Sequence, residues 1–172
     1  MDARSFDRPR QSPECVIECS DGTESPGNIG LTEFARSQRI RKYHTPFHRK
    51  LHETIDMIRP SAIIPIHTFT PILRSDGKPR PWHCAVLYSQ ATALGKNCIE
   101  FLSSVQGIAV GENTPYKIEP ESDFTVPIHA DRRNIPSVLI EIRQDLVSDS
   151  SGQRRWAAML AETIAECVQR DA

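Results

Sequence analysis

The chain has 172 residues, the length of one ordinary domain. Its 21 Lys and Arg residues nearly balance 22 Asp and Glu residues, which argues against binding to nucleic acid or to an anionic membrane surface. The longest apolar run, Ala62–Ile66, is far shorter than the roughly 20 residues that span a bilayer, and no signal peptide is recognisable. Five cysteines form no compact framework, which favours reduced thiols and a cytoplasmic protein.

Residues 1–30 are polar and rich in turn residues, so they predict an irregular arm within one domain that covers residues 1–172. A helix is expected to begin after Thr32, whose hydroxyl suits an N-cap. Pro46 lacks an N–H group and should kink or restart this helix, which continues to a stop before Pro60.

The rest of the chain alternates between apolar strands and amphipathic helices. The expected order is a strand over 62–69, a strand over 82–88, a helix over 89–105, a short strand over 108–110, a polar connection over 113–136, a strand within 137–146 and a helix over 152–168. The strands are apolar on both faces, which predicts an α/β fold with helices on each side of the sheet. Ligands of such sheets bind outside the strand ends.

Glu141 is the most informative residue, because it interrupts an apolar strand where an isolated carboxylate would be costly to bury. Arg143 lies two positions further on and therefore shares its face. Two interpretations stay open. Periodicity favours a structural ion pair at a strand end, whereas catalysis would use Glu141 as a general base or acid at the edge of the sheet.

Other candidate residues lie where predicted strands begin or end. His67 stands near the end of the strand over 62–69, a place suited to a metal ligand or a catalytic group as well as to an ordinary polar residue. Arg80 and His83 open the next strand and are candidates for binding a substrate carboxylate. His129 forms a second basic cluster with Arg132 and Arg133 in the polar connection, and such clusters are usually just solvated.

A zinc knuckle is the less favoured alternative. Cys15, Cys19, His44 and His48 imitate the spacing of a Cys2His2 site. Pro46 falls between the two histidines, however, and the cysteines lack the turn residues that shape a knuckle.

A series of short motifs resembles the N-formylglutamate amidohydrolase family, in order and spacing, from about Asp7 to the last helix. The motifs are Ser20-Asp21-Gly22-Thr23, Pro26-Gly27-Asn28, Gly30-Leu31, Pro46-Phe47-His48, Ile66-His67-Thr68-Phe69-Thr70-Pro71, Arg80-Pro81-Trp82-His83, Asn113-x-Pro115-Tyr116, His129-Ala130 and Ile140-Glu141-Ile142-Arg143-Gln144-Asp145-Leu146.

The resemblance implies a three-layer α/β/α fold like that of the zinc carboxypeptidases, with a mixed, mostly parallel sheet. It implies a zinc-dependent hydrolase that cleaves the amide bond of an N-formyl or N-acyl amino acid, a small acidic substrate. His67 resembles a zinc ligand and Glu141 the catalytic carboxylate that handles the proton of the attacking water. Arg80, His83, His129 and Arg143 are the candidates for holding the substrate's carboxylates.

The sequence also departs from the family. Members begin with a further strand–helix portion whose histidine-bearing loop should supply other zinc ligands, and no such portion precedes Asp7. Asp7-Arg8-Pro9-Arg10 resembles the family's Asp-x-Asn-Arg, with proline in place of asparagine. The alternative is therefore a catalytically inactive, truncated paralogue that binds a ligand or partner. An open apolar sheet edge would invite self-association or a complementing chain.

Overall fold

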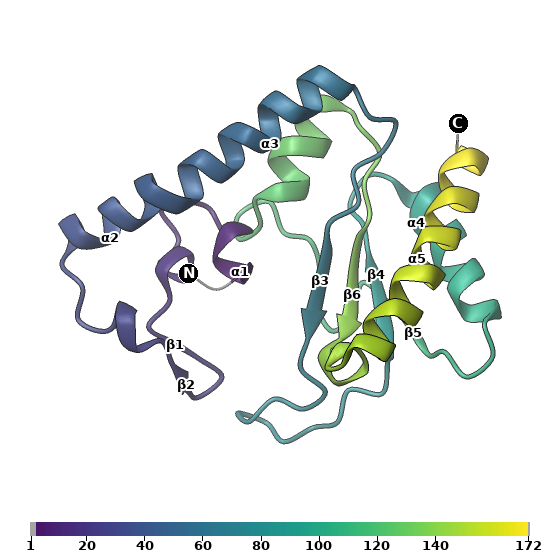
Figure 1. Cartoon of the computed structure of the whole chain (residues 1–172), viewed down its shortest axis with the longest axis horizontal. Helices are drawn as coiled ribbons and strands as arrows, with labels where there is room; N and C mark the ends of the chain where they lie inside the picture. Colours follow the sequence, from purple (N-terminus) through teal and green to yellow (C-terminus); the bar gives the residue numbers. More distant parts are fainter. Residues whose placement is uncertain (1–2, 172) are drawn as a thin grey trace.

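The computed structural model describes residues 3–171, with side chains from residue 5 to residue 170, and shows a mixed sheet flanked by helical layers (Figure 1). The strands of this sheet are β3 (Ile66–Phe69), β4 (Cys84–Leu87), β5 (Val110–Glu112) and β6 (Leu139–Arg143). Their order is β3-β6-β4-β5. Among the described strands of this sheet only the β4–β6 pair is antiparallel, which confirms the mixed, mostly parallel α/β fold.

Two helices cover one face of the sheet, α4 (Thr92–Ser104) and α5 (Ser150–Asp171). Their apolar stripes, predicted from helical spacing, meet strand residues in the main core. Its buried members are Cys84, Val86, Leu94, Cys98, Leu102, Val138, Ile140, Ile142, Trp156, Leu160 and Cys167. Alternate residues of β6 point to opposite faces, so Leu139 and Glu141 lie on the other side.

The opposite face is covered by a thinner layer. A π-helical segment (Thr125–Ala130) and a 3-10 turn (Asp131–Arg133) form within the connection that was predicted as merely polar. Val126 and Ala130 pack against Ala85, Leu87 and Leu139. Single helical turns lack a repeated apolar stripe, so sequence periodicity does not reveal this layer.

One long helical rod follows the arm and confirms the predicted cap at Thr32, whereas the kink or restart expected at Pro46 is replaced by a π-helical turn just before it. It consists of α2 (Glu33–Arg39), a π-helical turn (Ile40–His44) and α3 (Thr45–Ile58). The Thr32 hydroxyl accepts a hydrogen bond from the Ala35 N–H at 3.2 Å. The widened turn precedes Pro46, which has no N–H to donate to the ladder, so the rod continues past the proline.

The arm contains short elements instead of a wholly irregular path. They are α1 (Ala3–Phe6), a 3-10 turn (Pro13–Val16), a hairpin of β1 (Cys19–Ser20) and β2 (Thr23–Glu24), and a second 3-10 turn (Pro26–Asn28). The Asp21 carboxylate accepts hydrogen bonds from the Arg74 and Ser75 N–H groups at 2.8 and 3.1 Å. This contact ties the hairpin to the loop that follows β3.

Two predicted strands are displaced at their ends. In the strand expected over 62–69, continuous pairing with β6 begins only at Ile66, because Pro65 has no N–H to donate to the sheet. Before it, Ile63 forms an isolated bridge with Ser137. The strand expected over 108–110 occupies Val110–Glu112. The last turn before α5 is a 3-10 segment (Gln144–Val147).

Within residues 3–171, no helix has both the length and the apolar character needed to cross a bilayer.

Candidate active site

His67 and Glu141 lie opposite each other on the adjacent parallel strands β3 and β6. Since register partners point to the same face, both side chains belong to the thinly covered face of the sheet. Glu141 is also the register partner of Ala85 on β4, so it lies between His67 and a small apolar residue in the sheet. Glu141 is 7% exposed, whereas His67 is more open. The fold thus brings together the two residues singled out for catalysis and metal binding.

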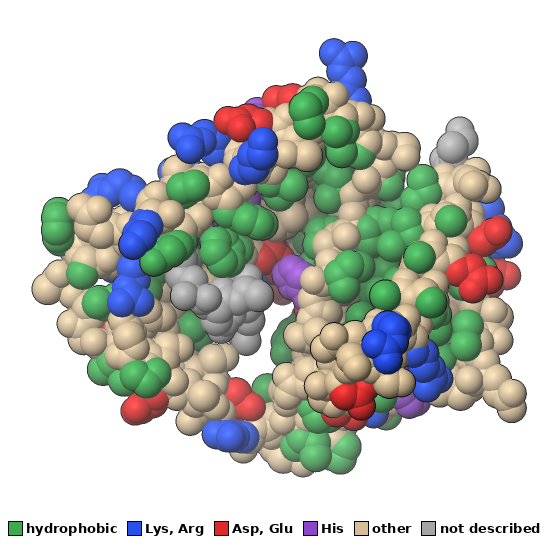
Figure 2. Space-filling view, in the orientation of Figure 1, with side chains coloured by type: hydrophobic (Ala, Val, Ile, Leu, Met, Phe, Trp, Pro, Cys, Tyr) green, Lys and Arg blue, Asp and Glu red, His purple; other side chains and the backbone are tan. Residues whose placement is uncertain are grey.

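Asp7 approaches His67 from the arm. Its Oδ1 accepts hydrogen bonds from the N–H groups of Thr125 and Phe124 at 2.6 and 3.3 Å. Its Oδ2 lies 3.8 Å from His67 Nε2. Figure 2 shows a hollow between the arm and the sheet, with acidic and histidine side chains visible at its wall. An acidic group and an imidazole therefore meet in the region where the arm faces β3.

Arg80 and Arg143 lie together at the edge where β3 and β6 end and β4 begins. Arg143 donates to the Arg80 carbonyl at 3.3 Å. Arg143 also pairs with Asp145 through Nε–Oδ1 at 2.8 Å, and this bond holds the pKa of the Asp145 carboxyl below its usual value. The Arg80 guanidinium donates to Tyr116 Oη at 2.9 Å. Both cations thus occupy the predicted strand-end position, each already held by protein groups.

His83 lies at the same edge, but its ring accepts a hydrogen bond from the backbone. Nδ1 accepts a hydrogen bond from the Ala109 N–H at 2.9 Å, which fixes Nε2 as the protonated nitrogen of the neutral ring. The residue is half-buried. Its role in substrate binding remains a prediction.

His129 lies apart from the strand-end cations, in a buried cluster with His48. His48 Nε2 lies 2.6 Å from the Phe6 carbonyl, and a carbonyl only accepts, so this nitrogen donates. The other nitrogen of neutral His48, Nδ1, then accepts from His129 Nε2 at 2.9 Å. With His129 only 3% exposed, a substrate would reach it only after this bond opened.

Burial keeps this cluster uncharged. Desolvation lowers the pKa of both His48 and His129 to about 4, against an ordinary value of 6.5. His44, which is fully buried one turn before His48, also has a lowered pKa because of burial. His44 Nε2 donates to the Arg8 carbonyl at 2.9 Å.

The donors at His67 do not by themselves complete a catalytic zinc site. Such sites generally use three protein ligands and a water molecule. Among the residues that the structure describes, no three His, Cys, Asp or Glu side chains come together in a way that could hold a metal ion. The same finding speaks against the zinc knuckle, since Cys15 is buried, Cys19 is exposed, and both histidines bond to arm carbonyls.

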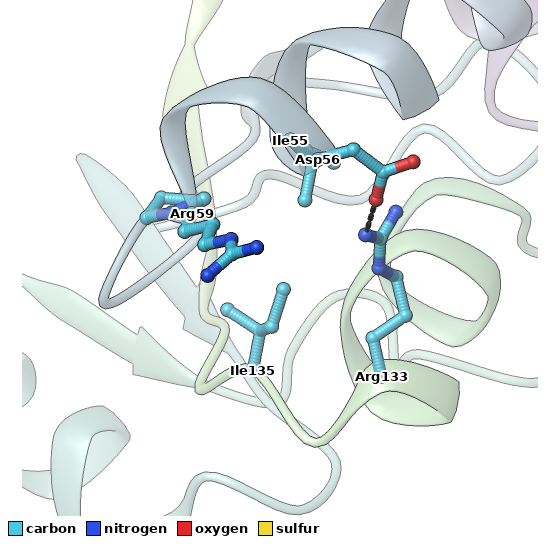
Figure 3. Close-up of a pocket in the computed structure, with 6 residues that line it drawn as sticks. Ile55, Asp56, Arg59, Arg133 and Ile135 are labelled. Carbon is cyan, nitrogen blue, oxygen red and sulfur yellow. Dashed lines mark hydrogen bonds and ion pairs between the residues drawn. The ribbon is translucent and has the colours of Figure 1, made fainter.

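A pocket of about 370 Å³ lies elsewhere, between the end of α3 and the 3-10 turn Asp131–Arg133 with the segment that follows it (Figure 3). It is lined by Ile55, Asp56, Arg59, Pro60, Arg133 and Ile135. Arg133 pairs with Asp56, while Arg59 extends toward the centre of the pocket. It lacks both His67 and Glu141, so we do not place the reaction there.

Asp7, His48 and Tyr116 are the site neighbours whose roles sequence reasoning did not assign. Asp7 stands in a turn-rich arm where no periodic pattern marks a buried carboxylate. His48 shares helical spacing with His44, but that spacing alone does not show that both side chains meet the arm. All three residues lie in motifs that resemble the family, and this resemblance is the signal that could have found them.

Comparison with known proteins adds two findings. The family model for N-formylglutamate amidohydrolase matches residues 6–148. A crystal structure of the gene product Atu2144 from Agrobacterium tumefaciens is similar in fold, with a TM-score of 0.83 and 26% sequence identity. The similarity covers 96% of this chain but 66% of that chain, so this chain spans just under two thirds of that protein. No curated protein matches the sequence.

Proposed function

This chain belongs to the N-formylglutamate amidohydrolase family, and on that premise we propose that it acts in the hydrolysis of an N-formyl or N-acyl amino acid such as N-formylglutamate. The observation that carries the proposal is that Glu141 and His67 are register partners on one face of the sheet. The Glu141 carboxylate is shielded from solvent there, whereas the His67 imidazole is partly exposed. A small acidic substrate would approach from the strand-end edge, where Arg80 and Arg143 lie.

In this proposal Glu141 moves the proton. Its carboxylate takes a proton from the attacking water, whose oxygen forms a bond to the formyl or acyl carbon. The carbon–nitrogen bond then breaks, and the proton passes from Glu141 to the leaving amine. The products are formate, or another carboxylic acid, and the free amino acid. Arg80, Arg143, His83 and His129 remain the candidates for holding the substrate's carboxylates.

We also propose that the reaction depends on zinc and that His67 is one ligand. Among the described residues no three His, Cys, Asp or Glu side chains lie together so as to hold a metal ion, so His67 is the one ligand that we assign. The same shortage of donors supports the alternative, an inactive paralogue that binds an acidic ligand or a partner.

The test is formate release from N-formylglutamate in the presence of zinc, for the wild type, Glu141→Gln and Glu100→Gln. Glu100 is an exposed residue of α4 and serves as the control. We expect activity in the wild type and in Glu100→Gln and its loss in Glu141→Gln with folding retained, because the amide keeps the shape but accepts no proton. Equal activity in Glu141→Gln would remove the assigned base. A wild type that is inactive with zinc would favour the paralogue.

A further inference from the structure

Two buried histidines hold the arm against the long helical rod. His44 and His48 are one helical turn apart and therefore project from the same side of the rod. Each donates its Nε2–H to a backbone carbonyl of the arm, His44 to Arg8 and His48 to Phe6. His44 is fully buried and His48 is 5% exposed. Both bonds are partly buried, so losing either one would leave polar groups with limited access to water, at a cost in stability.

The residue between the two held carbonyls is Asp7. The arm backbone is thus fixed on both sides of this one side chain, whose own Oδ1 accepts the Thr125 and Phe124 N–H groups. With one oxygen held in this way, the other oxygen faces His67 Nε2 at 3.8 Å. The position of Asp7 relative to His67 therefore depends on contacts to both the rod and the π-helical segment.

Neighbouring rings fix the orientation of His48. The His129 ring lies nearly parallel to it, with ring centroids 5.1 Å apart and planes 8° from parallel, and donates to its Nδ1. The Phe124 ring packs against both His48 and His44, with centroid separations of 4.4 and 5.2 Å. Because Nδ1 of His48 is used as an acceptor, its single hydrogen stays on Nε2 and points at the arm.

We propose that His44 and His48 are positioning residues that clip the segment Phe6–Arg8 to the rod and thereby set the Asp7 carboxylate opposite His67. His129 supports the clip by holding the tautomer of His48. The inference rests on the proposed function only in that it places His67 at the reaction site. The hydrogen bonds that form the clip do not depend on that function. Its tests therefore include measurements that need no substrate.

The first test uses the wild-type chain and cannot be confounded by misfolding. Long-range ¹⁵N–¹H NMR spectra of the imidazoles distinguish the two neutral tautomers near neutral pH. We expect His44, His48 and His129 all to carry their hydrogen on Nε2. A hydrogen on Nδ1 of either His44 or His48 would overturn the clip, because that ring could then not donate to the arm.

The second test compares His48→Gln with His48→Asn. The glutamine amide reaches about as far as Nε2 and keeps a donor for Phe6, whereas asparagine matches Nδ1 and loses it. The readout is hydrogen exchange at the Phe124 and Thr125 amides, whose acceptor is Asp7. We expect about tenfold faster exchange in His48→Asn and little change in His48→Gln. Equal exchange in both variants would contradict the clip.

His52→Ala is the matched control, since His52 is exposed on the same rod one turn beyond His48. It should leave exchange at Phe124 and Thr125 unchanged. If the wild type hydrolyses the substrate, His48→Asn should lower kcat about tenfold with little change in KM. His48→Gln should keep a kcat close to that of the wild type. An inactive wild type would count against the proposed function, while the NMR and exchange results would still decide the clip.

Discussion

Arg80 and Tyr116 form a cation–π pair that also contains a hydrogen bond. The guanidinium carbon lies 5.0 Å from the centroid of the tyrosine ring, and Nη1 donates to Oη at 2.9 Å. The same group lies 5.9 Å from the Phe69 ring centroid and donates to the Thr70 carbonyl at 3.3 Å. Arg80 therefore fastens the loop after β3 to the segment that follows β5, at the edge where substrate is expected.

Arg80→Lys should destabilise the fold by about 1–3 kcal/mol, because an ammonium group cannot replace the flat guanidinium between two rings. Tyr116→Phe removes only the hydroxyl and should cost about 1 kcal/mol. Chemical denaturation of both variants measures these losses. Equal stability of Arg80→Lys and the wild type would show that the rings and the bond contribute nothing.

A zinc ligand and a general base should respond differently to substitution. We expect His67→Ala to lose zinc that the wild type binds, and Glu141→Gln to keep it, because only His67 is proposed to bind the metal. Elemental analysis of metal-loaded, desalted protein gives the zinc content per chain. His52→Ala is the control for the general removal of a histidine. Zinc retained in His67→Ala would disprove the ligand assignment.

The buried histidines predict a loss of stability in acid. His48 and His129 have pKa values of about 4 in the folded chain and 6.5 ordinarily, so only the unfolded chain takes up protons between these values. Their contribution is fully present above about pH 6.5 and is lost as the pH falls toward 4. We expect a decrease of up to about 6 kcal/mol in the free energy of unfolding across this range, because two groups titrate and each pKa unit corresponds to about 1.4 kcal/mol.

Urea denaturation at a series of pH values measures this decrease, and His48→Gln separates it from other titrations. Glutamine keeps the donor to Phe6 but does not titrate, so the variant should show a flatter profile between pH 4 and 6.5. Parallel profiles for the variant and the wild type would assign the pH dependence to other groups.

Strand β3 lies at one end of the sheet, with β6 as its only neighbour within the described residues. Its first residue, Ile66, is 46% exposed. Such an edge offers backbone groups to another chain, and we expect concentration-dependent self-association or pairing there. Ile66→Lys should weaken it in analytical ultracentrifugation. Met57→Lys, at a 74% exposed position on α3, is the control and should leave the association unchanged. A chain that stays monomeric at all concentrations would refute self-association at this edge.

Local sequence signals predicted most elements that depend on contacts within the segment itself. Thr32 marks the start of the rod, Pro46 its widened turn, and the apolar runs mark β4 and β6. The stripe of Leu94, Cys98 and Leu102 identified the buried face of α4. The helical turns over 125–133 escaped prediction, because segments this short carry no repeat from which to infer a face.

By itself, the sequence determined the family, the α/β class and the choice of His67 and Glu141, since these follow from ordered motifs and from a carboxylate in an apolar strand. Only the tertiary structure decided that these two residues are register partners and that His48 bonds to His129, 81 positions away. It alone showed that Asp7 faces His67. The physical reason is that strand register and the docking of the arm depend on contacts between distant segments, whereas propensity and periodicity act over only a few residues.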